Sequence, residues 1–225
     1  MFNLLPRSTA RGVTHTFIRS ISYIKTPVRG LKKAQDSAMI TAKGELRPWS
    51  TDAANLSGLK DFLGSEFALP DSLALQVLTH KSFQHGFKGY NEKLALIGDK
   101  LLKVHIDSYA IQQESTNVTR VNQINFDCLG SPMNKFLSNT NVLGEFALRH
   151  GLTDSIYWKC RLDNLGQSSP ADSGLYSVAE KTMTAIVGAI SLHHGGAKAA
   201  QFVNQKLLQG EDSLINIADE KYDSY

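Results

Sequence analysis

The segment Asn-Glu-Lys-Leu-Ala-Leu-Ile-Gly-Asp-Lys-Leu-Leu, residues 91–102, opens a stretch that we expect to be helical from Asn91 to about Gln113. No proline interrupts this stretch, and its apolar residues recur at the three- and four-residue spacing of an amphipathic helix. The chain on both sides of it predicts further helices. The residues expected on the apolar face of the first helix are Leu94, Ile97, Leu101, Ile106 and Tyr109.

Helical spacing also predicts the other elements, and convincing period-2 alternation is absent, so we predict an all-α domain. Residues 138–140 are Ser, Asn and Thr, which cap helix starts, and Gly151 is placed to end the helix that they begin. The acidic residues 211–225 are expected to be loosely held. The other expected helices cover residues 59–67, 71–78, 121–137, 140–150, 177–193 and 199–208, with a loop at 162–174.

Length and composition place the chain among ordinary globular proteins. With 225 residues, 42% of them apolar, it can form one domain with a real core and tails. No apolar run approaches the roughly 18 residues that span a bilayer, so we expect no membrane span. Cys128 and Cys160 belong to no Cys-x-x-Cys motif, which disfavours a disulfide framework or a zinc site. His193-His194 lacks a third ligand at a useful spacing and is expected to be a surface pair.

Residues 1–35 have the composition of a mitochondrial transit peptide. They hold seven Lys and Arg residues and no acid before Asp36, with Ser, Thr and apolar residues between them. Such a segment forms a cationic amphipathic helix at an import receptor or an anionic membrane. Arg19 precedes a candidate processing site near residues 21/22. The alternative is a basic arm that is retained and binds nucleic acid, and both can hold because residues 23–47 stay basic after such a cut.

The folded body is not broadly basic. Removing the seven early cations takes the formal net charge from +3 to −4. Any RNA contact must therefore come from a local patch or from the N-terminal arm. We expect a presequence at 1–35, a linker or N-terminal arm at 36–58, the helical domain at 59–209 and an acidic tail at 210–225. The candidate RNA-contacting residues are Lys25, Arg29, Lys32, Lys33 and Lys81.

Four segments resemble, in order, the motifs of the ribonuclease III catalytic domain. They are Leu-Thr-His-Lys-Ser at 78–82, residues 91–102, the Ser-Asn to Gly-Leu segment at 138–152, and residues 178–196 around Ala-Ile-Val-Gly-Ala-Ile. The resemblance covers about two-thirds of the chain, and four collinear motifs are far more specific than one. It implies the ribonuclease III-like helical fold. In the first motif, His80 and Lys81 are expected to pack or cap.

That family cleaves double-stranded RNA with Mg²⁺ held by four carboxylates, two from each of two helices, and the ion activates the attacking water. The resemblance places these positions on Ala95, Asp99, Lys181 and Thr184. Only Asp99 is a carboxylate, and Lys181 repels a cation and is expected to pair with Asp99. Glu180 would have to move about 100° around its helix to substitute. We therefore expect no metal, no cofactor and no nuclease activity.

We expect a transit peptide, a ribonuclease III-like domain that keeps one of the four carboxylates, and no following double-stranded-RNA-binding domain. This combination resembles the ribonuclease III-like members of the fungal mitochondrial large ribosomal subunit. The resemblance implies a structural role in the mitochondrial matrix. It also implies two partners, the large-subunit rRNA and another ribonuclease III-like ribosomal protein paired through the helix that begins at Asn91. Losing carboxylates removes negative charge that would face RNA phosphates. The alternatives are a double-stranded-RNA endoribonuclease or RNA-processing factor active only with a partner subunit, and a free RNA-binding or splicing factor.

Overall fold

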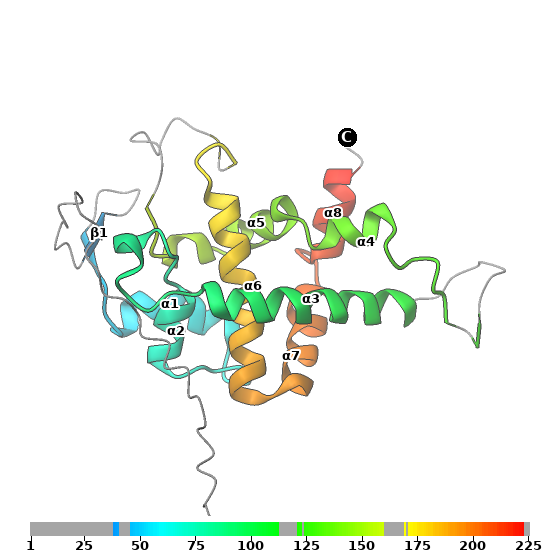
Figure 1. Cartoon of the computed structure of the whole chain (residues 1–225), viewed down its shortest axis with the longest axis horizontal. Helices are drawn as coiled ribbons and strands as arrows, with labels where there is room; N and C mark the ends of the chain where they lie inside the picture. Colours follow the sequence, from blue (N-terminus) through cyan, green and yellow to red (C-terminus); the bar gives the residue numbers. More distant parts are fainter. Residues whose placement is uncertain are drawn as a thin grey trace, which may run out of the picture. The chain divides into compact units, whose positions relative to one another are not determined.

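The computed structural model describes residues 38–40, 46–112, 121–122, 124–159, 169 and 171–222 (Figure 1). The predicted transit peptide, with Lys25, Arg29, Lys32 and Lys33, lies outside the described residues, as does Cys160. A short antiparallel ribbon of β1 (Ala38–Ile40) and β2 (Leu46–Pro48) precedes the helices. The helices that follow are α1 (Ala53–Leu63), α2 (Asp71–Val77), η1 (Phe83–Gly86), α3 (Glu92–Gln112), α4 (Pro132–Leu137), α5 (Thr140–Arg149), η2 (Leu152–Ser155), α6 (Leu175–His194), α7 (Gly196–Phe202), the short π-helix η3 (Val203–Leu207) and α8 (Leu214–Tyr222).

Helices α3 and α6 cross each other in close contact (Figure 1). Residues 182–190 of α6 are all buried, as expected of a helix that is enclosed on every side. At the crossing a Cβ on Gly98 would overlap the carbonyl of Thr184, and a Cβ on Gly188 would overlap the carbonyl of Leu94. Glycine alone has no Cβ, so Gly98 and Gly188 set how closely the two backbones lie.

The predicted all-α domain is confirmed. Within the described part of residues 53–222, the chain forms helices and two isolated bridges but no strand. Asn139 caps α5, because its side chain accepts from the backbone N–H of Asn141 at 3.2 Å, and Gly151 follows α5 with φ of 66°. Gly195, with φ of 92°, separates α6 from α7 and lies between the expected helices at 177–193 and 199–208. Among the described helices none combines the length and the apolar character that crossing a bilayer requires.

The expected helix at residues 121–137 is wrong over its first half. In the described part of this segment the helix is only α4, which begins at Pro132. The Ser131 hydroxyl caps it by accepting from the N–H of Asn134 at 3.1 Å, and proline is favoured in the first turn. At the other end of the domain α1 begins at Ala53, ahead of the expected start at 59, and buries Leu56 completely. The predicted loop at 162–174 lies largely outside the described residues.

Two other expectations are corrected. The C-terminal segment is not loosely held, because α8 buries Leu214, Ile217 and Ala218 in the core. These residues recur at i, i+3 and i+4, the spacing of one helix face, among acidic neighbours. Ile97 is not on the buried face of α3 but is 40% exposed, and Gly98 takes its place at the crossing with α6.

The segment before α1 is tied to the domain by Arg47. Its guanidinium donates to the carbonyl of Asp154 at 2.6 Å and to the side chain of Asn55 at 3.2 Å, and it lies 4.6 Å from the ring centre of Tyr157. The Tyr157 hydroxyl donates to the carbonyl of Pro48 at 2.8 Å. The end of the predicted N-terminal arm therefore packs on α1 and η2 rather than forming a free linker.

Candidate functional site

Three segments that are distant in sequence meet beside the start of α3. The backbone after α2 pairs with residue 157, because the N–H of His80 donates to the carbonyl of Tyr157 at 2.9 Å and the N–H of Tyr157 donates to the carbonyl of Leu78 at 2.8 Å. The N–H of Asn91 then donates to the carbonyl of Thr79 at 2.9 Å, which fixes the start of α3 against the same strand-like segment. These bonds hold the first and second predicted motifs together.

Asn91 is a buried connector between helices. It is 1% exposed, and its amide donates to the carbonyl of Val77 at 3.0 Å and lies 3.5 Å from the hydroxyl of Thr182. A buried amide needs such partners, because leaving it unpaired would cost free energy. The Asn that opens the quoted segment therefore joins α2, α3 and α6 and has a structural role.

His80 caps a local turn, whereas Lys81 neither packs nor caps but is exposed and forms an ion pair. The His80 Nδ1 accepts from the backbone N–H of Ser82 at 3.2 Å and lies 2.9 Å from the Ser82 hydroxyl. Burial lowers the pKa of His80, Glu92 opposes this shift, and the nearby Lys181 and Lys81 add to it. The ammonium of Lys81 donates to Glu92 at 2.9 and 3.1 Å, which raises the pKa of Lys81.

These segments enclose an open cleft with a volume of about 440 Å³. It lies between the residues after α2, the first turn of α3 and the second turn of α6. Two lysines and one glutamate supply its formal charges, so the lining carries a net charge of +1 at neutral pH. The lining residues are His80, Lys81, Ser82, Asn91, Glu92 and Lys181.

The four positions matched to the metal ligands lie on α3 and α6, at the crossing and at its edge. Ala95 is 3% exposed and Thr184 is 1% exposed, so both are buried where the helices pack. The Thr184 hydroxyl donates to the carbonyls of Glu180 at 2.9 Å and Lys181 at 3.1 Å. Its hydroxyl proton is thus used within the helix, and the position offers no charged oxygen.

The expected ion pair between Lys181 and Asp99 is wrong. Lys181 lies 3.4 Å from Glu180, its neighbour in sequence, whereas Asp99 pairs along α3 with Lys103 at 2.9 Å and Lys100 at 3.1 Å. Partial burial acts to raise the pKa of Asp99, but the hydrogen bonds from Lys103 and Lys100 outweigh it, so the pKa lies below its ordinary value. Pairing along one helix needs no long-range placement and satisfies both partners.

These residues do not fit a Mg²⁺ ion. Mg²⁺ needs several hard oxygen ligands in octahedral geometry, and Asp99 is the one carboxylate among the four matched positions, already engaged by two ammonium groups. Throughout the described residues no group of three or more His, Cys, Asp or Glu side chains is gathered as a metal site would require. What the cleft offers instead is a pair of lysines, which attract anions.

Lys81 can be predicted from the sequence as an RNA contact, whereas the cleft and the part that Lys181 and Glu92 have in it cannot. The sequence predicts Lys181 as a lost ligand paired with Asp99, and its position near Lys81 and His80 comes from the packing of α6 against the segment after α2. Glu92 had no role before its pairing with Lys81 was seen. The sequence carries one indication of the cleft, because Lys81 and Lys181 both fall within motifs that resemble those of ribonuclease III.

The comparisons with known proteins agree with this architecture. A family model described as Ribonuclease-III-like matches residues 70–210. The nuclease domain of ribonuclease III from Campylobacter jejuni has the same fold, with a TM-score of 0.51 at 21% identity, over 75% of this chain and 96% of that chain. A second structure of that domain gives a TM-score of 0.51 over 73% of this chain and 96% of the other.

Two relatives share a name. The large ribosomal subunit protein mL57 of Neurospora crassa is 28% identical over 174 residues, which cover 71% of this chain and 64% of that protein. The protein of the same name from Schizosaccharomyces pombe is 26% identical over 140 residues, 61% of this chain and 60% of that protein. The chain therefore spans less than two thirds of the length of either relative. The match of the family model covers more than half of the chain and confirms the predicted resemblance: this protein belongs to the ribonuclease-III-like family.

Proposed function

We propose that the protein is a structural component of the mitochondrial large ribosomal subunit, where its ribonuclease III-like domain holds ribosomal RNA without cutting it. The observation that carries this proposal is the similarity to the two mL57 proteins, which are named as large ribosomal subunit proteins. The acid-free, Arg- and Ser-rich residues 1–35 support a mitochondrial destination, with processing near residues 21/22. The working location is then the mitochondrial matrix.

The matched metal positions support a role without catalysis. Phosphodiester hydrolysis in this family depends on Mg²⁺, and Ala95, Thr184 and Lys181 supply no carboxylate to hold it. With these carboxylates absent, the surface that would face RNA loses negative charge and repels phosphates less. Duplex RNA is recognised largely through its shape and backbone, so the fold can keep its RNA partner after losing its chemistry.

A cleavage assay tests the loss of activity. The purified full chain is incubated with long duplex RNA, with and without Mg²⁺, beside an active ribonuclease III. We expect RNA binding and no Mg²⁺-dependent products. Products that appear with Mg²⁺ and vanish in the Asp99→Asn variant would contradict the proposal and favour the alternative of an endoribonuclease.

The second proposed partner is another ribonuclease III-like ribosomal protein that docks on α3. The outer face of α3 carries the apolar side chains of Leu96, Ile97 and Val104, which are 66%, 40% and 56% exposed. Large apolar side chains grouped on one exposed helix face favour burial against a partner. We expect Leu96→Glu combined with Val104→Glu to abolish copurification of such a partner with the tagged chain. Leu192→Glu, at an exposed leucine of α6, is the matched control and should leave copurification unchanged.

A further inference from the structure

The cleft beside the start of α3 brings two lysines together from separate elements. Lys81 comes from the segment after α2 and Lys181 from the second turn of α6, and their side chains are 57% and 46% exposed. Both lysines therefore line the cleft and keep part of their side chains exposed to solvent. From this placement we propose that the cleft binds one backbone phosphate of duplex RNA between Lys81 and Lys181. This binding site rests on the proposed function, whose RNA contact it locates.

The remaining groups around the cleft fit an anion of this size. The backbone N–H of Lys159 donates to the hydroxyl of Ser82, a lining residue, at 3.0 Å, so this hydroxyl is held in place beside the cleft. The cleft also faces the N-terminal turn of the 21-residue helix α3, whose macrodipole favours negative charge. The volume of about 440 Å³ admits a phosphate with its adjoining riboses, because the site is open rather than enclosed.

Two carboxylates compete with the anion. Glu92 pairs with Lys81 at 2.9 Å, and Glu180 lies 3.4 Å from Lys181. Ion pairs at exposed sites contribute little free energy, since water and salt screen them. A phosphate that carries one full charge and presents two free oxygens can therefore replace the carboxylates as the partner of both lysines. Lysine binds phosphate as a point charge, so no rigid geometry has to be preformed.

The test measures the affinity of the purified full chain for a short labelled duplex RNA by fluorescence anisotropy over a range of KCl concentrations. We expect Lys81→Gln and Lys181→Gln each to weaken binding about fivefold near physiological salt, and each to reduce the slope of log affinity against log salt by about one. Lys181→Arg should restore binding, because it keeps the charge. Glu92→Gln should strengthen binding, because it removes the competing carboxylate.

Lys60→Gln is the matched control. Lys60 is exposed to a similar degree and is paired with Asp71 at 2.7 Å, as Lys81 is paired with Glu92, but it lies on α1. An unchanged affinity and salt slope in the Lys81→Gln/Lys181→Gln double variant would overturn the proposal, even if the chain still sediments with ribosomes. Titration with inorganic phosphate at constant ionic strength separates the two sources of the ligand. If both lysine substitutions leave RNA binding unchanged while inorganic phosphate binds in the cleft, the assignment of the site to RNA is also overturned.

Discussion

Gly98 and Gly188 decide how α3 and α6 pack, because neither position has room for a side chain. A Cβ at Gly98 would overlap the backbone of Thr184, and a Cβ at Gly188 would overlap the backbone of Leu94. Backbone atoms inside two crossed helices cannot move aside as the end of a side chain can. The helices would have to separate, which opens space along the whole contact.

We therefore expect Gly98→Ala to lower the free energy of unfolding by about 3 kcal/mol. Gly196→Ala is the control, because Gly196 starts α7 and a Cβ there meets nothing within 4 Å. The control should change stability by no more than about 0.5 kcal/mol. Urea denaturation monitored by circular dichroism measures both, and an equal effect of the two substitutions would disprove the role assigned to the crossing.

Three histidines link stability to pH. Burial lowers the pKa of His80, His105 and His150 in the folded protein, and Nε2 of His105 is buried without a hydrogen-bond partner among the described residues. Above the ordinary histidine pKa of about 6.5 these histidines are neutral in the folded and in the unfolded protein, so the free energy of unfolding has its full value. Below it the unfolded chain binds protons first, so stability falls as pH falls.

The contribution of His105 can be separated by two substitutions. His105→Leu and His105→Gln should both make the loss of stability between pH 7 and pH 5 shallower than in the wild type. Only His105→Leu should also raise stability at pH 7, by about 1 kcal/mol, because it removes the unpaired buried nitrogen. Unfolding curves at pH 7 and pH 5 measure both effects. If the loss of stability between the two pH values is the same in both variants as in the wild type, the role of His105 is contradicted.

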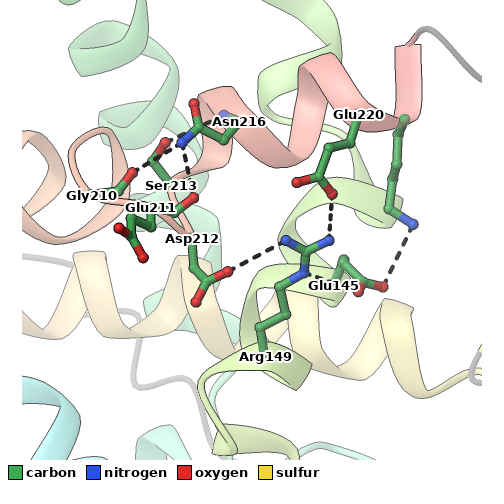
Figure 2. A network of polar contacts seen from close by, with 9 residues as sticks. Glu145, Arg149, Gly210, Glu211, Asp212, Ser213, Asn216 and Glu220 are labelled. Carbon is green, nitrogen blue, oxygen red and sulfur yellow. Dashed lines mark hydrogen bonds and ion pairs between the residues drawn. The ribbon is translucent and has the colours of Figure 1, made fainter.

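At the scale of elements, α8 is tied to α5 by an ion-pair network centred on Arg149, to which Lys221 of α8 adds a contact with Glu145 at 3.6 Å (Figure 2). Arg149 pairs with Glu220 at 2.6 Å, with Glu145 at 3.2 Å and with Asp212 at 3.4 Å. Glu145 in turn accepts from the hydroxyl of Tyr176 on α6 at 2.6 Å, and burial together with this hydrogen bond raises the pKa of Tyr176 to about 12. The network thus joins α5, α6 and α8 at one point.

Replacing Arg149 with Gln should destabilise the protein by about 1–2 kcal/mol and loosen α8 first. The side chain is 29% exposed, so salt should reduce the difference between variant and wild type. Hydrogen exchange of the α8 amides, measured at low and high salt, tests this. Lys60→Gln removes an isolated surface pair and should leave α8 protected as in the wild type. Equal protection of α8 in the Arg149 variant would show that apolar burial alone holds the helix.

Sequence patterns predicted long elements better than short ones. The helix from Asn91 was expected within a residue of its observed ends, because its apolar spacing is regular over many turns. The helix α8 was missed, because acidic composition outweighed the spacing of Leu214, Ile217 and Ala218. The predicted helix at 121–137 is wrong before Pro132. The apolar residues there fit helical spacing, but the cap at Ser131 starts the helix only at Pro132.

At the scale of the whole molecule, the family fold could be predicted from four motifs, but the cleft and its lining could not. The motifs match Ala95, Asp99, Lys181 and Thr184 to the metal-binding positions of the family, and so predict which carboxylates are missing. They do not show that Lys181 lies with Lys81 in one cleft, because that depends on how residues 100 positions apart are brought together. The sequence also placed Ile97 inside, whereas packing turns it to the exposed face of α3.

The most direct measurement is sedimentation of the endogenous protein from a mitochondrial lysate on sucrose gradients at high and at low Mg²⁺. Low Mg²⁺ separates the ribosomal subunits, so a component of the large subunit has to follow that subunit in both gradients. We expect the protein to migrate with the large subunit at either Mg²⁺ concentration. If it stays near the top of the gradient while the large-subunit RNA sediments normally, it is not a ribosomal component and the proposed function is wrong.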